Sequence, residues 1–233
     1  MEITADIDFW IGLVKIVWIN IILSGDNAVV IALAARSLPP HQQRKAILLG
    51  SGAAVVLRIA LTLVAAQLLS IPYLQIIGGL LLLWIGVQLL SEGGDGDEGE
   101  GEAKVYGSMM AAVRTILIAD LIMSLDNVIG VAAAAKGSMV LLMLGLAISI
   151  PLVVFGSALM IKLMDRFPVI VVIGAALIGW VGGETLVSDV ALKGLLEGSY
   201  WFQQAGALAG AVLVVLLGTY LQKKRSSELT DQV

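Results

Sequence analysis

Two short stretches of the sequence place a carboxylate beside an amide inside long apolar runs. Asp26 and Asn27 lie in the first run, and Asp126 and Asn127 lie one hundred residues later. A carboxylate in the middle of a membrane-spanning helix costs about 2.5–3.5 kcal/mol, so it usually faces a partner, a cavity or an ion. Carboxylate and amide oxygens are hard ligands suited to divalent cations. The repeated pair therefore predicts one shared cation site inside a membrane.

Two further acids and one base also lie within apolar runs. Asp120 and Glu184 are the acids, and Arg58 is the base. If Arg58 pairs with Asp26 or Asp126, four acids less one base still leave three carboxylates for a divalent cation. We therefore expect Asp120 and Glu184 to join the metal site. Arg58 is expected either to occupy this site when metal is absent or to tether two helices.

Helical spacing groups these polar residues on two faces. Residues three and four positions apart share one face of a helix. Two sets have this spacing: Asn20, Ser24 and Asn27, and Asp120, Ser124 and Asn127. Asp26 and Asp126 lie six residues beyond the first member of each set, about 120° away around an ideal helix. They join these faces fully only if the helices unwind, and Gly25 offers a break in the first run.

The composition is that of a polytopic membrane protein. Of 233 residues, 59% are hydrophobic and 14% are charged, and the mean hydropathy is +0.98, outside the range of soluble domains. The chain has no cysteine, which excludes disulfides and thiolate metal sites. Its one histidine, His41, lies in a polar loop, which argues against an imidazole-based zinc or copper centre. We expect no resident cofactor.

The net charge of −4 comes from one segment. Residues 91–102 hold six of the 18 acids, and the remaining 12 are outnumbered by 14 basic residues. Because this balance is nearly even, we expect no nucleic-acid partner. The wider segment 91–107 is predicted to be an acidic, glycine-rich linker on the cytoplasmic side.

Apolar segments long enough to cross a hydrocarbon core of about 30 Å can be counted directly. The predicted fold is all-α, with seven transmembrane helices and a cytoplasmic tail at 222–233. The expected spans are residues 9–35, 46–69, 74–90, 108–135, 139–163, 169–187 and 202–221.

The two halves of the chain resemble each other. Four residues recur 96 positions later: Pro72, Gly78, Trp84 and Gly86 return as Pro168, Gly174, Trp180 and Gly182. We therefore expect a three-helix repeat at 9–90, a second at 108–187 and an appended seventh helix at 202–221. Each repeat has an odd number of crossings, so the second must enter the membrane from the opposite side. Inverted repeats of this kind are typical of secondary transporters.

Basic residues gather in the connections that seven spans place on one side of the membrane. They are Arg36, Arg44, Lys45, Lys104, Lys162, Arg166, Lys223, Lys224 and Arg225. Lysine and arginine mark the cytoplasmic side of a membrane protein. The C-terminus is therefore predicted to be cytoplasmic and the N-terminus outside, in the plasma membrane.

The sequence Ser-Gly-Asp-Asn at 24–27, its second form Ser-Leu-Asp-Asn at 124–127 and the seven-span plan resemble the TerC family of integral membrane proteins. Within that family the chain is similar to the YjbE-like branch associated with manganese export. The resemblance covers residues 9–221. It implies Mn²⁺ efflux with Asp26 and Asp126 as ligands, and placement in the superfamily of LysE-type exporters.

Three functions are compatible with carboxylates inside apolar helices. The leading prediction is a secondary transporter that exports Mn²⁺ by alternating access, with Asp26, Asn27, Asp126 and Asn127 as ligands. The second is a membrane organiser, in which polar residues only join helices and Asp26→Asn preserves function. The third, an intramembrane aspartyl protease, needs two carboxyls about 3 Å apart, and residues 23–26 do not match its Gly-x-Gly-Asp signature. We expect no enzyme. The partners are a divalent metal ion and lipid, and a homo-oligomer stays open.

Overall fold

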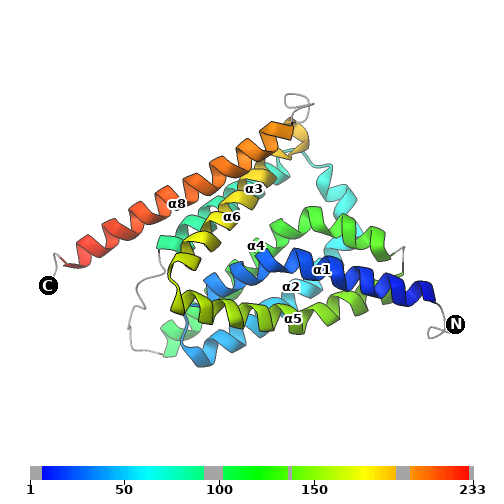
Figure 1. The fold of residues 1–233 in the computed structure, drawn as a ribbon, viewed down its shortest axis with the longest axis horizontal. Helices are drawn as coiled ribbons and strands as arrows, with labels where there is room; N and C mark the ends of the chain where they lie inside the picture. The colour runs from blue at the N-terminus through cyan, green and yellow to red at the C-terminus, as the bar shows by residue number, and fades with distance from the viewer. Residues whose placement is uncertain (1–6, 92–101, 136–137, 193–199, 231–233) are drawn as a thin grey trace.

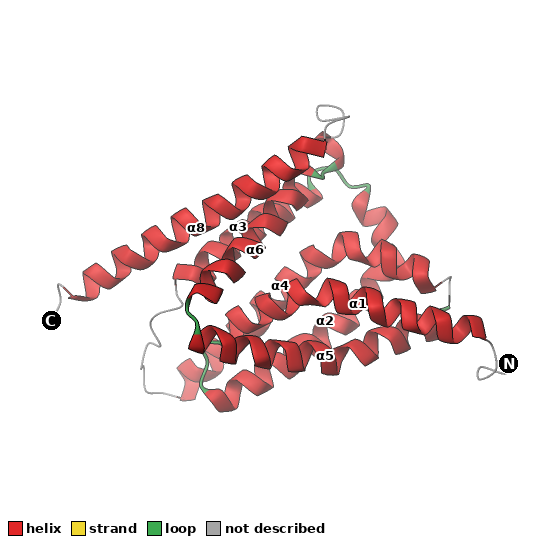
Figure 2. Ribbon diagram, in the orientation of Figure 1, coloured by secondary structure: helices red, strands yellow, loops and turns green. Residues whose placement is uncertain are grey.

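The computed structural model describes residues 7–91, 102–135, 138–192 and 200–230 of the chain. All regular structure in these ranges is α-helical, which confirms that the fold is all-α as predicted (Figure 2). The helices are α1 (Ile7–Ala35), α2 (Pro40–Leu69), α3 (Leu74–Ser91), α4 (Glu102–Ala135), α5 (Met139–Arg166), α6 (Val169–Val187) and α8 (Tyr200–Thr230).

Five of the described helices are long and apolar enough to cross a membrane. The qualifying segments are Pro40–Val64, Leu74–Ser91, Val140–Arg166, Val169–Val187 and Trp201–Arg225. A shorter apolar stretch, Gly25–Ala35, belongs to α1. Large apolar side chains such as Trp18, Val56 and Phe155 point away from the protein interior, as contact with lipid tails requires. The architecture is that of a multi-pass membrane protein, and the count of seven spans stays a prediction.

The first helix does not break at Gly25. α1 is helical without interruption from Ile7 to Ala35, and α4 is likewise continuous through Ser124. The unwinding that the sequence suggested is therefore absent. A continuous helix pairs its backbone N–H and C=O groups internally, which removes the cost of leaving them unpaired in lipid. Asp26 consequently keeps its helical position, about 100° around the axis from Asn27.

Two helices extend into segments that the sequence assigned to polar regions. α4 begins at Glu102, so it includes residues 102–107 of the expected linker, and α8 continues through the expected tail to Thr230. The rest of the acidic linker, residues 92–101, lies outside the described residues.

The helices form two groups. α1, α2, α4 and α5 make a four-helix group, in which α1 packs along α5 and α2 packs along α4. α3, α6 and α8 make a three-helix group, in which each helix packs against the other two (Figure 1). The groups meet where Gly78 of α3 faces Ile122 of α4, and where Gly174 of α6 faces Val29 of α1.

Glycines bring the helices of the three-helix group into backbone contact. α6 carries Gly179 and Gly183, and α8 carries Gly206 and Gly210, each pair at the spacing Gly-x-x-x-Gly. A Cβ on Gly179 would lie 2.5 Å from the carbonyl oxygen of Gly210, and one on Gly183 would collide with that of Gly206. Small residues at this spacing are what membrane helices use to approach closely. They hold α6 against α8.

Candidate cation site

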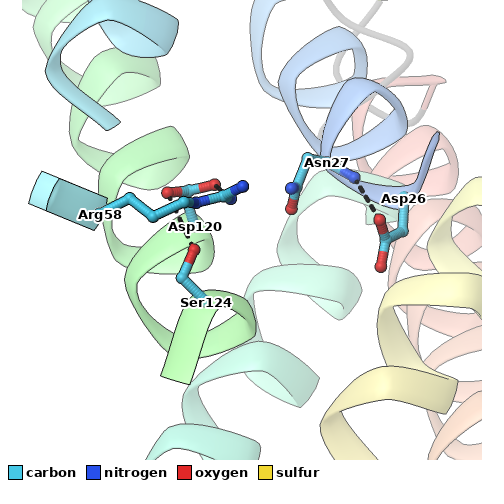
Figure 3. Close-up of polar contacts among 5 residues, drawn as sticks. All are labelled: Asp26, Asn27, Arg58, Asp120 and Ser124. Atoms are coloured by element: carbon cyan, nitrogen blue, oxygen red, sulfur yellow. Dashed lines mark hydrogen bonds and ion pairs between the residues drawn. The ribbon is translucent and has the colours of Figure 1, made fainter. Parts of the chain in front are cut away.

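A buried ion pair lies in the four-helix group. Nη2 of Arg58, on α2, donates to Oδ1 of Asp120, on α4, at 2.5 Å. Each side chain is 8% exposed. The packing of α2 along α4 brings the two side chains together (Figure 3). An ion pair so shielded from water is costly to break by removing one partner.

Two hydroxyl side chains complete the surroundings of this pair. The hydroxyl of Ser124 donates to Oδ2 of Asp120 at 3.2 Å, which confirms the prediction that residues 120 and 124 share one face. Ser51 lies seven residues before Arg58 on the same face of α2. Among the described residues, neither Ser51 Oγ nor Arg58 Nε has a hydrogen-bond partner. These two polar atoms are therefore available to form a hydrogen bond with a bound species.

A small cavity opens beside the ion pair, and all four helices of the four-helix group line it. Its volume is about 20 Å³, enough for one water molecule. The polar lining consists of Asn27, Ser51, Arg58 and Asp120. The apolar lining consists of Ile31, Ala54, Val55, Leu146, Ile150 and Val153. A small molecule or ion in this cavity would therefore meet carboxylate, amide and hydroxyl oxygens, surrounded by apolar side chains.

Asp26 and Asn27 have different surroundings. Asn27 is buried and lines the cavity, and its side chain points toward the Arg58–Asp120 pair in Figure 3. Asp26 is half-buried and its carboxylate points away from that pair. Its Oδ1 accepts the backbone N–H of Asn27 at 2.9 Å. In this conformation the amide, and not the neighbouring carboxylate, faces the cavity.

The remaining residues of the expected metal site are not gathered at the cavity. Asn127 is half-buried on α4 and does not line it, and Glu184 is exposed on α6. The side chain of Asp126 lies outside the described residues, as do those of Asn20 and Ser24. Among the described side chains, no three or more of the types Asp, Glu, His and Cys come together as a metal-binding group.

The partner of Arg58 differs from the residues that the sequence suggested. Asp26 and Asp126 were the named examples, and the structure pairs Arg58 with Asp120. The reason is which helices are neighbours, since α2 packs closely along α4 and only lightly against α1. That pairing is a tertiary feature, so no spacing within one helix predicts it.

Comparison with known proteins decides the family. Residues 5–226 match the family described as integral membrane protein TerC. The chain belongs to the TerC family. It is 41% identical over 216 residues to the "Uncharacterized membrane protein YjbE" of Bacillus subtilis (strain 168), covering 93% of this chain and 97% of that protein. The resemblance drawn from the repeated Asp-Asn stretches is thereby confirmed, and the protein is an integral membrane protein.

Two relatives of lower identity are longer proteins. The "UPF0053 inner membrane protein YoaE" of Escherichia coli (strain K12) is 29% identical over 189 residues, covering 74% of this chain and 36% of that protein. A "UPF0053 protein" of Buchnera aphidicola subsp. Schizaphis graminum is 27% identical, covering 88% of this chain and 42% of that protein. This chain spans less than half of either relative. No solved structure matches it significantly.

Asp189 of this TerC family protein is a further functional group that the sequence did not reveal. It is fully buried just beyond the end of α6. Its Oδ1 accepts the backbone N–H groups of Tyr73 at 2.9 Å and Ala191 at 2.7 Å, and its Oδ2 accepts those of Gln75 at 3.0 Å and Ile76 at 3.2 Å. Asp189 therefore caps the start of α3 from another part of the chain.

The environment of Asp189 keeps it charged. Burial alone would raise the pKa of this carboxyl, but the backbone N–H groups of Ala191, Tyr73, Ile76 and Gln75 together hold the pKa below its usual value. Tyr73 adopts a positive φ of 69° at this turn. The residue type at 189 is a common capping residue, but the helix that it caps begins more than one hundred positions earlier, so sequence spacing gives no signal.

Proposed function

We propose that this TerC family protein is a secondary transporter that exports divalent metal ions, Mn²⁺ foremost, through the cavity beside Asp120. The observation that carries the proposal is the buried Arg58–Asp120 pair, which lines a small cavity together with Asn27 and Ser51 inside an apolar helical protein. Charged residues held inside membrane proteins typically mark the path of a substrate or an ion. The resemblance to the manganese-associated branch of the family supports Mn²⁺ as the substrate.

The ion pair gives the site a way to open and close. Arg58 neutralises Asp120, so the described charges at the cavity sum to zero and a metal ion gains little by entering. An arriving divalent cation competes with the guanidinium for the carboxylate, and Arg58 moves aside when the cation wins. Asp120 and Asn27 then supply hard oxygen ligands, with the Ser124 hydroxyl supporting the carboxylate. Arg58 thus acts as the internal counter-ion of the metal-free state.

The carboxylates of Asp26 and Asp126 bind the metal ion in another state of the transport cycle. Asp26 is one residue from Asn27, so a rotation of α1 by about 100° exchanges one for the other at the cavity. Asp126 and Asn127 occupy the corresponding places on α4. Glu184, exposed on α6, then serves as a ligand on the way to or from the site. The full set supplies enough negative charge to hold a divalent cation in place of Arg58.

The packing of the helices supports an inverted repeat. If α1, α2 and α3 are exchanged for α4, α5 and α6, the pattern of contacts among these six helices stays the same. The contact of α1 with α5 corresponds to that of α4 with α2, and the contact of α1 with α6 corresponds to that of α4 with α3. Gly78 and Gly174, equivalent by sequence, each face the first helix of the other repeat. With α1 and α4 at 29 and 34 residues, each is long enough to span, giving seven spans with α8 appended.

Two repeats that exchange roles provide alternating access to a site between them. The basic connections, including Arg44, Lys45 and Lys162, favour the cytoplasm for the ends at which α1 and α5 finish. This assignment puts the N-terminus outside and the C-terminus inside. Net export then needs an energy source, and proton entry from outside would supply it by protonating the carboxylates and releasing the metal there.

The function is tested by measuring intracellular manganese in cells that lack endogenous exporters and grow under a Mn²⁺ load. Wild type is expected to lower the cellular Mn content, and Asp26→Ala, Asp120→Asn and Asp126→Ala to restore it at matched membrane expression. Asp165→Asn, at an exposed carboxylate near the end of α5, is the control and should behave as wild type. Unchanged Mn content in all strains would remove Mn²⁺ export. If well-folded Asp26→Ala and Asp120→Asn lower the cellular Mn content as far as wild type does, the result would favour a membrane organiser.

A further inference from the structure

A second, larger cavity lies away from the ion pair, between α1, α5, α6 and α8. Its volume is about 370 Å³, within the range of sites that hold organic ligands. Its lining is almost entirely apolar and consists of Val29, Met160, Leu163, Ile170, Ile173, Gly174, Ala176, Leu177, Trp180 and Ala211. None of these side chains is charged, so the cavity suits a hydrocarbon chain.

The length of this cavity matches one leaflet of a membrane. Along α6 the lining runs from Ile170 to Trp180, which is about 15 Å at the helical rise of 1.5 Å per residue. The hydrocarbon core of a bilayer is about 30 Å thick. The cavity therefore begins at the end of the membrane where α6 starts and ends near the midplane.

Two basic residues lie at the α5–α6 turn, close in sequence to residues that line the cavity. Leu163 and Ile170 line the cavity on either side of the turn that joins α5 to α6, and Arg166 lies in the last turn of α5 between them. Arg166 stands over the ring of Phe167, with its guanidinium carbon 5.7 Å from the ring centre. Lys162, one turn earlier, is exposed, as is Arg166. Within the described residues, neither side chain takes part in a salt bridge.

The nearby acid lies close enough to a third base to interact with it. Asp165 is the carboxylate of this turn, and it interacts electrostatically with Arg36 at the end of α1. Arg36 is half-buried, whereas Lys162 and Arg166 face outward. Lys162 and Arg166 therefore leave two positive charges at the turn beside an apolar cavity. A ligand that complements both features has an anionic head and a hydrocarbon tail.

We propose that this cavity is a binding site for an anionic phospholipid of the leaflet at the α5–α6 turn. One acyl chain fills the cavity between α5 and α6, and the phosphate binds Lys162 and Arg166. Each basic side chain at an anionic leaflet strengthens such binding by about fivefold. Because Val29 and Gly174 both line the cavity and contact each other, the bound chain rests on the junction between the two helix groups.

The test compares lipids retained by the full-length protein after reconstitution into vesicles of phosphatidylcholine and phosphatidylglycerol. Bound lipid is counted by native mass spectrometry. Wild type is expected to retain one phosphatidylglycerol in preference to phosphatidylcholine. Lys162→Gln with Arg166→Gln should weaken that preference by about fivefold per charge removed. Ala176→Phe, which fills the cavity, should lower retention of both lipids.

The control is Arg44→Gln with Lys45→Gln, two exposed basic residues near the start of α2 that line no part of the cavity. This variant should keep the preference of wild type. Equal retention of the two lipids by wild type, or equal losses in the control and the Lys162/Arg166 variant, would overturn the proposal. A dimer that Ala176→Phe dissociates without changing bound lipid would also overturn it, because a second copy would then occupy the cavity.

Discussion

The two helix groups are held together by different kinds of contact. In the three-helix group, α6 meets α8 at paired glycines that leave no space for a single added carbon. In the four-helix group, α2 meets α4 across the side chains of Arg58 and Asp120, beside a cavity. Backbone contact is rigid because neither side can reorient, whereas a contact between long side chains has more than one arrangement.

This difference assigns separate roles to the two groups. The three-helix group is fixed at one end by Asp189 and along its length by glycines, so it is suited to move as a unit. The four-helix group contains the Arg58–Asp120 pair, whose pairing changes when a cation arrives under the proposed function. A transporter needs both a rigid part and an element with two arrangements. Substitutions that act on one group and not the other test this division.

Asp120→Ala should have the largest effect on stability. It leaves the guanidinium of Arg58 buried without its partner, which costs about 3–5 kcal/mol. Thermal unfolding in detergent measures the loss. The matched variant is Arg58→Met combined with Asp120→Leu, which removes both charges and should unfold near the wild-type temperature. If the double variant is as unstable as Asp120→Ala, the loss reflects packing and not the orphaned charge.

Asp189→Ala should have the next largest effect, in the three-helix group. The backbone N–H groups of Tyr73, Gln75 and Ile76 lose their acceptor, which costs about 2–4 kcal/mol by the sum of a lost cap and unpaired buried donors. Hydrogen exchange should accelerate at the start of α3 while α2 and α4 keep their protection. Acceleration spread evenly over both groups would contradict the division between them.

The same carboxylate makes a prediction about pH. The folded pKa of Asp189 lies below its ordinary value, so the unfolded chain binds the proton more readily. The stabilisation by Asp189 is therefore fully present above the unfolded pKa of about 3.9 and disappears as the pH falls through the folded value. The stability difference between wild type and Asp189→Asn should stay constant from pH 6 to 8 and shrink in acid. A difference that varies between pH 6 and 8 would contradict this assignment.

Two glycine-to-alanine substitutions should have smaller effects of opposite sign. Gly183→Ala pushes a methyl group into the carbonyl of Gly206 and should cost about 1–3 kcal/mol through overpacking. Gly52→Ala meets nothing within 4 Å on α2 and should gain up to about 1 kcal/mol in helix propensity. Thermal unfolding compares the two. Equal shifts in one direction would show that the α6–α8 contact is looser than the structure has it.

The apolar parts of the helices could be predicted from the sequence because each is a run of membrane-spanning length, whereas the polar extensions of α4 and α8 could not. α6 begins at Val169 and ends at Val187 as expected, and Asp120 and Ser124 share a face because helical spacing requires it. The partner of Arg58 and the cap provided by Asp189 could not be predicted. Both depend on which helices become neighbours, and apolar helices carry little information about that choice.

The orientation of Asp26 also lay beyond the sequence. A glycine beside an aspartate is compatible with either a broken or a continuous helix, and only packing decides between them. The continuous α1 puts Asn27 at the cavity and Asp26 to one side. Asp26 and Asp126 therefore remain predicted ligands. Asp120 and Arg58 are buried inside the protein as expected, but they pair with each other and not with the residues that the sequence suggested.

The most direct measurement is Mn²⁺ binding to the purified protein, followed through the electron paramagnetic resonance signal of free Mn²⁺. If Arg58 competes with the metal for Asp120, substitutions of the two residues should change the affinity for Mn²⁺ in opposite directions. Arg58→Gln should tighten binding by about tenfold, equivalent to about 1.4 kcal/mol of competition removed, and Asp120→Asn should abolish it. Lys162→Gln, which removes an exposed positive charge, should leave binding unchanged. Equal weakening by Arg58→Gln and Asp120→Asn would contradict the switch and make the pair a structural tether.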